Sequence, residues 1–385
     1  MLKKMIAVML TGMLVVGALG ACSSNDTKEA TSEAPASETG ATEDTVLEGE
    51  KEPAEAGAEE PVNASDIKVG VIFTSAGLGG KSFNDLTFDG VKRAKEELGI
   101  DYDEVEPKSV SDEEIIQDEM ADSGEYALII CVGFEQKDAL TKVAANYPDQ
   151  KFVILDAEVD APNVASYLSK EEESSFLVGV LSALVQDGKI NDMVNDKNTV
   201  GFIGGDDNAL INKFRAGYEA GVKYVNPDIA VLSDYVGGFS DTATAKAIAT
   251  TMNQKGADII FHAAGAAGKG LFTAAEENKF MAIGVNSNQN EEAPDYIVAS
   301  MLKNADVAAF HVIQDVIEGT FAPGQHILGL KEDGVGYTVE GSSIQVPAEI
   351  IAKVDEVKEK VISGEIVVPA DPAEVESFIA NNKIQ

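Results

Sequence analysis

The sequence predicts an α/β protein with two lobes, each a parallel sheet flanked by helices. Two observations lead to this fold class. Short β-branched runs alternate with helical patterns along the chain, and the same alternation restarts about halfway. Parallel strands need crossover helices, which pack on the faces of the sheet. Ligands of such sheets bind beyond the carboxyl ends of the strands, so two facing lobes would form a cleft between them.

Residues 1–21 have the organisation of a secretory signal peptide. Two lysines precede a short apolar run that ends in small residues. The segment Leu19-Gly20-Ala21-Cys22 resembles the bacterial lipobox, in which the cysteine is diacylated and becomes the first residue after cleavage. An ordinary signal peptide or a short membrane anchor is the alternative, but a span needs about 20 apolar residues. We therefore expect lipidation at Cys22 and a lipid-anchored protein on the extracytoplasmic face of a cell membrane.

Residues 22–65 are predicted to be a disordered, acidic tether. They contain about twelve acidic and two basic side chains and almost no large apolar ones. Such a segment cannot bury enough surface to offset the entropy of ordering it. The net charge of the whole chain, -37, also argues against a nucleic acid partner, because binding one requires basic side chains that neutralise phosphates.

The remaining residues, about 320 in number, suffice for two domains with their own cores. In the first series we expect strands at 68–73, 128–132 and 152–155 and helices at 84–98 and 137–146. Ser82 and Asp85 stand three residues apart, as in a capping box. After a helix at 171–186, the second series has strands at 200–204, 231–235, 259–261 and 282–285, with helices at 210–225 and from about 241 to 256.

The expected lobes are discontinuous in sequence. Lobe one comprises 67–166 plus 287–322, lobe two comprises 167–286 plus 323–370, and 371–385 form a C-terminal segment. Three crossings between the lobes would form a hinge.

Two glycine-rich loops follow strands. The first, from Ser75 to Ser82, ends in Gly-Lys-Ser like a Walker A phosphate loop, but Ser75 stands where that motif needs its first glycine. Little ATP is present outside the cytoplasm, so a nucleotide-hydrolysing loop is not predicted. The second, Gly265 to Gly270, would let the backbone approach a bound ligand.

No catalytic constellation is evident. His262, His311 and His326 have no metal-ligand spacing with cysteine or carboxylate, and no serine lies in a Gly-x-Ser-x-Gly elbow. His262 ends a strand beside a glycine-rich turn and could touch ligand, although a structural histidine is the favoured interpretation. Cys131 is the only cysteine after Cys22, so no intramolecular disulfide is expected and Cys131 is a buried apolar residue. We expect no enzyme activity, no cofactor and no metal site.

Seven ordered blocks resemble the basic membrane protein (BMP) family. Its members are PnrA-like purine-nucleoside receptor lipoproteins, the substrate-binding components of ABC importers. The resemblance covers essentially all of residues 67–370. The blocks are Gly79–Asp85, Phe152–Asp156, Ser175–Gly179, Phe214–Gly221, Gly238–Asp241, Ile283–Asn286 and Ser300–Lys303.

The resemblance implies the type I periplasmic-binding-protein fold, with a nucleoside clamped between the lobes. Phe83 and Phe239 would sandwich the base, since aromatic stacking on a base contributes about 1 to 3 kcal/mol. Asn84 and Asp156 would lie at the base edge, and Gly265, Asn286 and Lys303 near the ribose. Without the family context, core packing is the simpler role for the two phenylalanines. The implied partners are a small-molecule ligand and an ABC permease, and the expected state is a monomer.

The chain departs from the family where carboxylates are usual. Asn286 and Asn288 replace aspartates, and Thr74 stands where many members carry aspartate. An amide presents one oxygen where a carboxylate presents two. The alternatives are therefore a changed ligand (a free base, a modified nucleoside or another small polar molecule), a surface interaction lipoprotein, or a nucleoside-acting enzyme with Asp156 as its acid.

Overall fold

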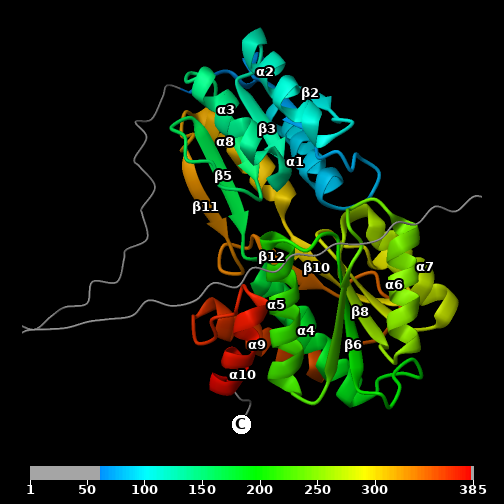
Figure 1. The fold of residues 1–385 in the computed structure, drawn as a ribbon. Helices are drawn as coiled ribbons and strands as arrows, with labels where there is room; N and C mark the ends of the chain where they lie inside the picture. Colours follow the sequence, from blue (N-terminus) through cyan, green and yellow to red (C-terminus); the bar gives the residue numbers. More distant parts are fainter. Residues whose placement is uncertain (1–60, 383–385) are drawn as a thin grey trace, which may run out of the picture. The chain divides into compact units, whose positions relative to one another are not determined.

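The computed structural model describes residues 61–382, and these fold around two six-stranded sheets (Figure 1). The predicted signal peptide, the lipidation site Cys22 and almost all of the predicted tether lie outside the described residues. In the first sheet the strand order is β11-β5-β4-β3-β1-β2, and in the second it is β12-β10-β9-β8-β6-β7. All pairings are parallel except that of β12 with β10.

The strands of the first sheet are β1 (Lys68–Ile72), β2 (Asp101–Val105), β3 (Leu128–Val132), β4 (Phe152–Leu155), β5 (Val164–Ser169) and β11 (Gly324–Leu328). Those of the second are β6 (Thr199–Gly204), β7 (Ala230–Tyr235), β8 (Ile259–Ala263), β9 (Met281–Gly284), β10 (Ile297–Lys303) and β12 (Val335–Thr338). The helices are α1 (Phe83–Leu98), α2 (Glu113–Ser123), α3 (Lys137–Asn146), α4 (Glu171–Gly188), α5 (Ala209–Val225), α6 (Thr242–Gln254), α7 (Lys269–Asn278), α8 (Ala305–Glu318), α9 (Ala348–Ile362) and α10 (Val375–Asn381).

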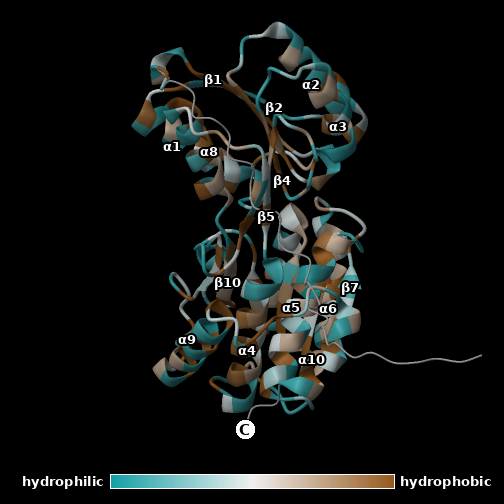
Figure 2. Cartoon of the chain, turned by 90° about the vertical axis from the view of Figure 1, so that its left-hand side faces the viewer, coloured by the Kyte–Doolittle hydropathy of each residue, from teal (hydrophilic) through white to brown (hydrophobic). Residues whose placement is uncertain are grey.

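Each sheet is buried on both faces, as its continuous apolar strands require. In β3, Leu128 and Ile130 face a core shared with α1 and α8, whereas Ile129 and Cys131 face α2 and α3. The second sheet likewise packs against α4, α5, α9 and α10 on one face and against α6 and α7 on the other. Figure 2 shows the hydrophilic residues gathered on the outer surfaces of the helices. Among the described residues, no helix is long and apolar enough to cross a membrane.

The lobe boundaries differ from those predicted. The segment 287–322 was expected in lobe one, but β10 pairs with β9 and β12 in the second sheet. Conversely, β11 pairs with β5 in the first sheet, whereas 323–370 was expected in lobe two. The chain therefore passes between the sheets after β5, after β10 and after β11. The lobe to which a strand belongs is decided by its pairing with strands that are distant in the sequence. The local pattern of a strand does not reveal this pairing.

The expected capping box at the start of α1 is wrong. The Ser82 side chain makes no cap bond, and its Oγ instead accepts a 3.0 Å hydrogen bond from Asn286 Nδ2 in the other lobe. The Asp85 carboxylate accepts from the Gly79 backbone N–H at 2.8 Å. Both side chains are therefore used by tertiary contacts that the local spacing does not reveal.

Helices α4 and α5 approach so closely that glycine is required between them (Figure 1). A β-carbon added at Gly221 would lie 2.1 Å from the Phe176 backbone oxygen and 2.9 Å from the Val180 nitrogen. Backbone atoms cannot move aside as the end of a flexible side chain can. The glycine at position 221 therefore permits the close spacing of the two helices in the core of the second lobe.

We expect Gly221→Ala to lower the free energy of unfolding by about 1 to 3 kcal/mol, because the methyl group forces α4 and α5 apart. Urea denaturation followed by circular dichroism measures this loss. Gly336→Ala is the matched control, since a β-carbon there has no atom within 4 Å. Equal stability losses in the two variants would contradict the close-packing argument.

Candidate functional site

A cavity of about 370 Å³ lies between the carboxyl ends of the two sheets. All seven ligand-binding residues expected from the sequence line it: Phe83, Asn84, Asp156, Phe239, Gly265, Asn286 and Lys303. The wall also contains Phe134, Glu135, Asp206 and Phe214, which the sequence analysis did not select. Glu135 and Asp206 come just after β3 and β6, so the rule that sites form at strand ends would have identified them.

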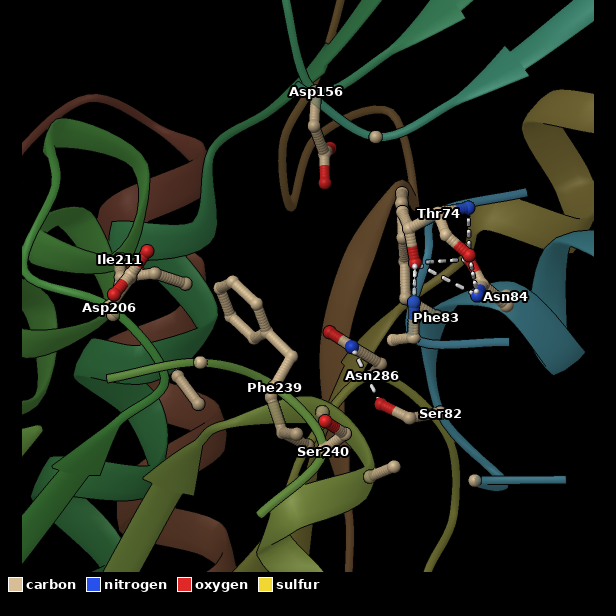
Figure 3. Close-up of a pocket in the computed structure, with 18 of the residues that line it drawn as sticks. Thr74, Ser82, Phe83, Asn84, Asp156, Asp206, Ile211, Phe239, Ser240 and Asn286 are labelled. Carbon is tan, nitrogen blue, oxygen red and sulfur yellow. Dashed lines mark hydrogen bonds between the residues drawn. The ribbon is translucent and has the colours of Figure 1, made fainter. Parts of the chain in front are cut away.

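Phe83 and Phe239 stand on opposite sides of this cavity (Figure 3). Phe83 opens α1 in the first lobe, and Phe239 follows β7 in the second. The Phe239 ring packs directly on Gly205, where an added β-carbon would lie 2.3 Å from it, and its centroid lies 6.4 Å from that of the Phe134 ring. The cavity thus has two aromatic walls supplied by different lobes.

Asn84 holds the loop that follows β1. Its Nδ2 donates to Thr74 Oγ1 at 2.9 Å and to the Gly77 backbone oxygen at 2.8 Å (Figure 3). The Asn84 side chain is buried, and these two bonds use both of its amide hydrogens inside its own lobe. Asn84 therefore positions Thr74 and the glycine-rich loop in addition to lining the cavity.

A buried ionic cluster forms the back of the cavity. The Lys303 ammonium pairs with Asp156 Oδ1 and, at 2.8 Å, with Glu171 Oε1. The second carboxylate oxygen of Glu171, Oε2, lies 3.4 Å from Lys213 Nζ. The Lys303 side chain is only 3% exposed and that of Glu171 is fully buried. Burial acts to lower the pKa of Lys303, but the two carboxylates outweigh it and raise that pKa. Lys303 is therefore a permanent cation whose charge is already neutralised.

Asn286 presents an unused acceptor. Its Nδ2 donates to Ser82 Oγ, whereas its Oδ1 is buried and has no hydrogen-bond partner among the described residues. Figure 3 shows this oxygen pointing into the cavity toward Phe239. The residue has a positive φ of 68°, a conformation in which asparagine is enriched among non-glycine residues. A buried oxygen without a partner is costly unless a ligand donates to it.

The glycine-rich loop of the first lobe rests on the second lobe at one rim of the cavity. The Lys81 backbone oxygen accepts from Ser287 Oγ and from Gln289 Nε2, both at 3.0 Å. Lys269 Nζ donates to the Gly79 oxygen at 2.8 Å, and the Lys81 side chain pairs with Glu292. The structure therefore holds the lobes together here through contacts within the protein.

His262 is fully buried behind the second glycine-rich turn. Its Nε2 lies 3.2 Å from Gln289 Oε1, and burial lowers the pKa of His262 to about 4, so the ring is neutral near pH 7. It is absent from the residues lining the cavity, and the described chain contains no group of three or more His, Cys, Asp or Glu side chains that could hold a metal ion. Its position suits a structural role.

Known proteins resemble this chain over almost its whole described length. The model of the family described as Bmp, ABC transporter substrate-binding protein PnrA-like, matches residues 67–372. An uncharacterised lipoprotein of Pyrococcus abyssi is 35% identical over 293 residues, covering 73% of this chain and 71% of that protein. Basic membrane protein A of Borreliella burgdorferi is 33% identical over 311 residues, covering 78% and 87%.

Solved structures agree on the fold. An ABC transporter solute-binding protein from Aeropyrum pernix superimposes with a TM-score of 0.73 at 33% identity and covers 82% of this chain and 98% of its own. The fold class predicted from the sequence, two α/β lobes of the periplasmic-binding-protein type, is confirmed.

We expect Lys303→Met to lower the free energy of unfolding by about 3 to 5 kcal/mol at pH 7.5, because it leaves Asp156 and Glu171 buried without their cation. Carboxyls left in this state have a folded pKa above the unfolded one, so the loss relative to wild type shrinks as the pH falls toward 5. Urea denaturation at several pH values measures it.

Lys213→Met is the control, since the Lys213 side chain is 32% exposed and its ion pair is longer. It should cost less than about 1 kcal/mol. A Lys303→Met loss that does not change with pH would contradict the assignment of a buried ionic cluster.

Proposed function

Because the chain belongs to the Bmp family of PnrA-like ABC transporter substrate-binding proteins, we propose that it captures a purine nucleoside between its two lobes and delivers it to a membrane permease. The observation that carries the proposal is the pair of aromatic walls, Phe83 and Phe239, facing one cavity from opposite lobes. A planar base stacks between such rings whatever its substituents, and each stacking contact contributes about 1 to 3 kcal/mol.

The polar groups around these walls suit a nucleoside better than a nucleotide. Lys303 is the only basic side chain among the cavity-lining residues, and its charge is already matched by Asp156 and Glu171. No cation there remains to neutralise a phosphate. The free Asn286 oxygen can accept from a hydroxyl or amino group of the ligand. We assign the base edge to Asp156 and the ribose to Asn286, Lys303 and the turn at Gly265.

A ligand that binds between the lobes also influences how the two lobes are arranged. A ligand that touches both lobes stabilises the closed arrangement by the difference between its affinities for the closed and open states. A permease that recognises the closed form then receives loaded protein in preference to empty protein. Lipidation at Cys22 would keep the monomer at the extracytoplasmic face of the membrane, in keeping with relatives named as lipoproteins.

The arrangement of Asp156 argues against the alternative of a nucleoside-cleaving enzyme. An acid that protonates a leaving base needs a proton and access to the glycosidic bond. Burial raises the pKa of Asp156, but its carboxylate is bonded to the Lys303 ammonium, which occupies the oxygen that an acid would need to present to the glycosidic bond. We therefore propose a binding function without catalysis.

The full chain, purified in detergent and refolded to remove carried-over ligand, should melt at a higher temperature with adenosine, guanosine or inosine. A ligand at about a hundred times its Kd adds roughly 2.7 kcal/mol of stability. We expect Phe239→Ala to weaken nucleoside binding in calorimetry about 10- to 100-fold, because one stacking wall is lost.

Phe88→Ala is the matched control, since Phe88 packs against Phe73 and Tyr102 and does not line the cavity. It should alter stability without changing nucleoside affinity. If nucleosides give no shift while a free base or another small polar molecule does, the ligand class is changed. No shift with any small molecule would favour a surface interaction protein.

A further inference from the structure

Two carboxylates of the cavity wall have no partner. Glu135 belongs to the short helical turn Phe134–Gln136 after β3, in the first lobe, and Asp206 follows β6, in the second. Both line the cavity, and neither side chain has a hydrogen bond or ion pair within the described residues. Burial raises the pKa of Glu135, and the negative charge of Asp206 opposite raises it further, which is consistent with two like charges lying near each other across the cleft.

The positions of these two residues are fixed by the backbone around them. Next to Glu135, Gln136 Nε2 donates to the Ile72 oxygen at 2.7 Å and to the Val132 oxygen at 2.9 Å, which ties the turn to the sheet. Next to Asp206, the Gly205 N–H donates to the Ala263 oxygen at 2.9 Å. Two like charges on the wall of one cavity repel, and a cation bound between them removes this repulsion.

The rest of the cavity wall is acidic in balance and holds an acceptor that no residue described in the structure uses. Asn286 is 91% buried, yet its Oδ1 has no partner in the part of the chain that the structure describes, and it points into the cavity. Four carboxylates line the wall, those of Asp85, Glu135, Asp156 and Asp206, against the single ammonium of Lys303. The ionisable side chains of the cavity wall are therefore mainly acidic, which favours a ligand that brings positive charge.

We propose that Glu135 and Asp206 form a subsite that binds a positively charged amino group of the ligand. The inference rests on the proposed function, because it assigns one end of the same cavity, and it narrows the ligand class to nucleosides that carry a protonated amine. A protonated amine has three donors, enough to bond a carboxylate from each lobe at once. The same contact joins the lobes, so recognition of the charge also favours closure.

The experiment compares three probes by calorimetry on the full chain at pH 7.5 and fixed ionic strength. Adenosine is neutral, 5′-amino-5′-deoxyadenosine carries an ammonium at the sugar end, and N6-(2-aminoethyl)adenosine carries one at the base end. We expect at least one amine to bind tenfold or more tightly than adenosine. In Glu135→Gln and in Asp206→Asn, the ratio of the Kd of adenosine to the Kd of the tighter-binding amine should fall toward one.

Asp207→Asn is the matched control. Asp207 is exposed and lies outside the cavity, and its substitution changes the net charge by the same amount as the two cavity substitutions. It should keep the wild-type ratio. Adenosine binding without any preference for an amine, or a preference that survives both cavity substitutions, would overturn this inference alone. No binding of any of the three probes, nor of guanosine or inosine, would overturn the proposed function and the inference together.

Discussion

The ion cluster around Lys303 is the constraint on which the cavity depends. Lys303 ends β10 of the second sheet, Asp156 follows β4 of the first sheet, and Glu171 begins α4 directly after the first crossing between the sheets. One buried ammonium thus fixes the ends of three elements at the place where the chain changes lobe. Buried ion pairs are weak sources of net stability, since desolvation offsets their attraction. Their value in this wall is geometric, because the same ammonium also lies 4.8 Å from the centroid of Phe83.

The two lobes are joined at one rim of the cavity, and across the cavity they present acceptors that are not paired. At one rim, the glycine-rich loop is already joined to the second lobe through the backbone oxygens of Gly79 and Lys81. Across the cavity, the side-chain oxygens Asn286 Oδ1 and those of Glu135 and Asp206 have no hydrogen-bond partner among residues 61–382. The rim contacts supply part of the free energy that favours the closed arrangement of the lobes. The unpaired acceptors make the rest of that free energy depend on a ligand. Such a division suits a receptor whose closed form signals occupancy.

The sequence predicts most buried elements and few of the exposed ones. Strands such as β3 and β4 are continuous apolar runs and were placed at their observed bounds. Strand β2 was missed because its sequence, Asp-Tyr-Asp-Glu-Val, is that of a half-exposed edge. The lobe assignment of β10 and β11 failed because pairing between distant strands has no local signature. In the site, six of the seven expected residues came from family blocks, and Gly265 came from a glycine-rich turn. Glu135 and Asp206 follow two correctly predicted strands, but they lie outside every block, and with 66 acidic residues in the chain their type alone does not distinguish them.

Asn286 shows why the loss of a carboxylate need not mean the loss of a site. An aspartate at this position would offer two acceptors and no donor, so it could not donate to Ser82 as the amide does. The asparagine donates across the cleft to Ser82 and directs its oxygen into the cavity. One side chain therefore joins the two lobes and also presents an unpaired acceptor to the cavity. Because the cavity already carries four carboxylates, an uncharged acceptor here also avoids adding a fifth negative charge beside the ligand.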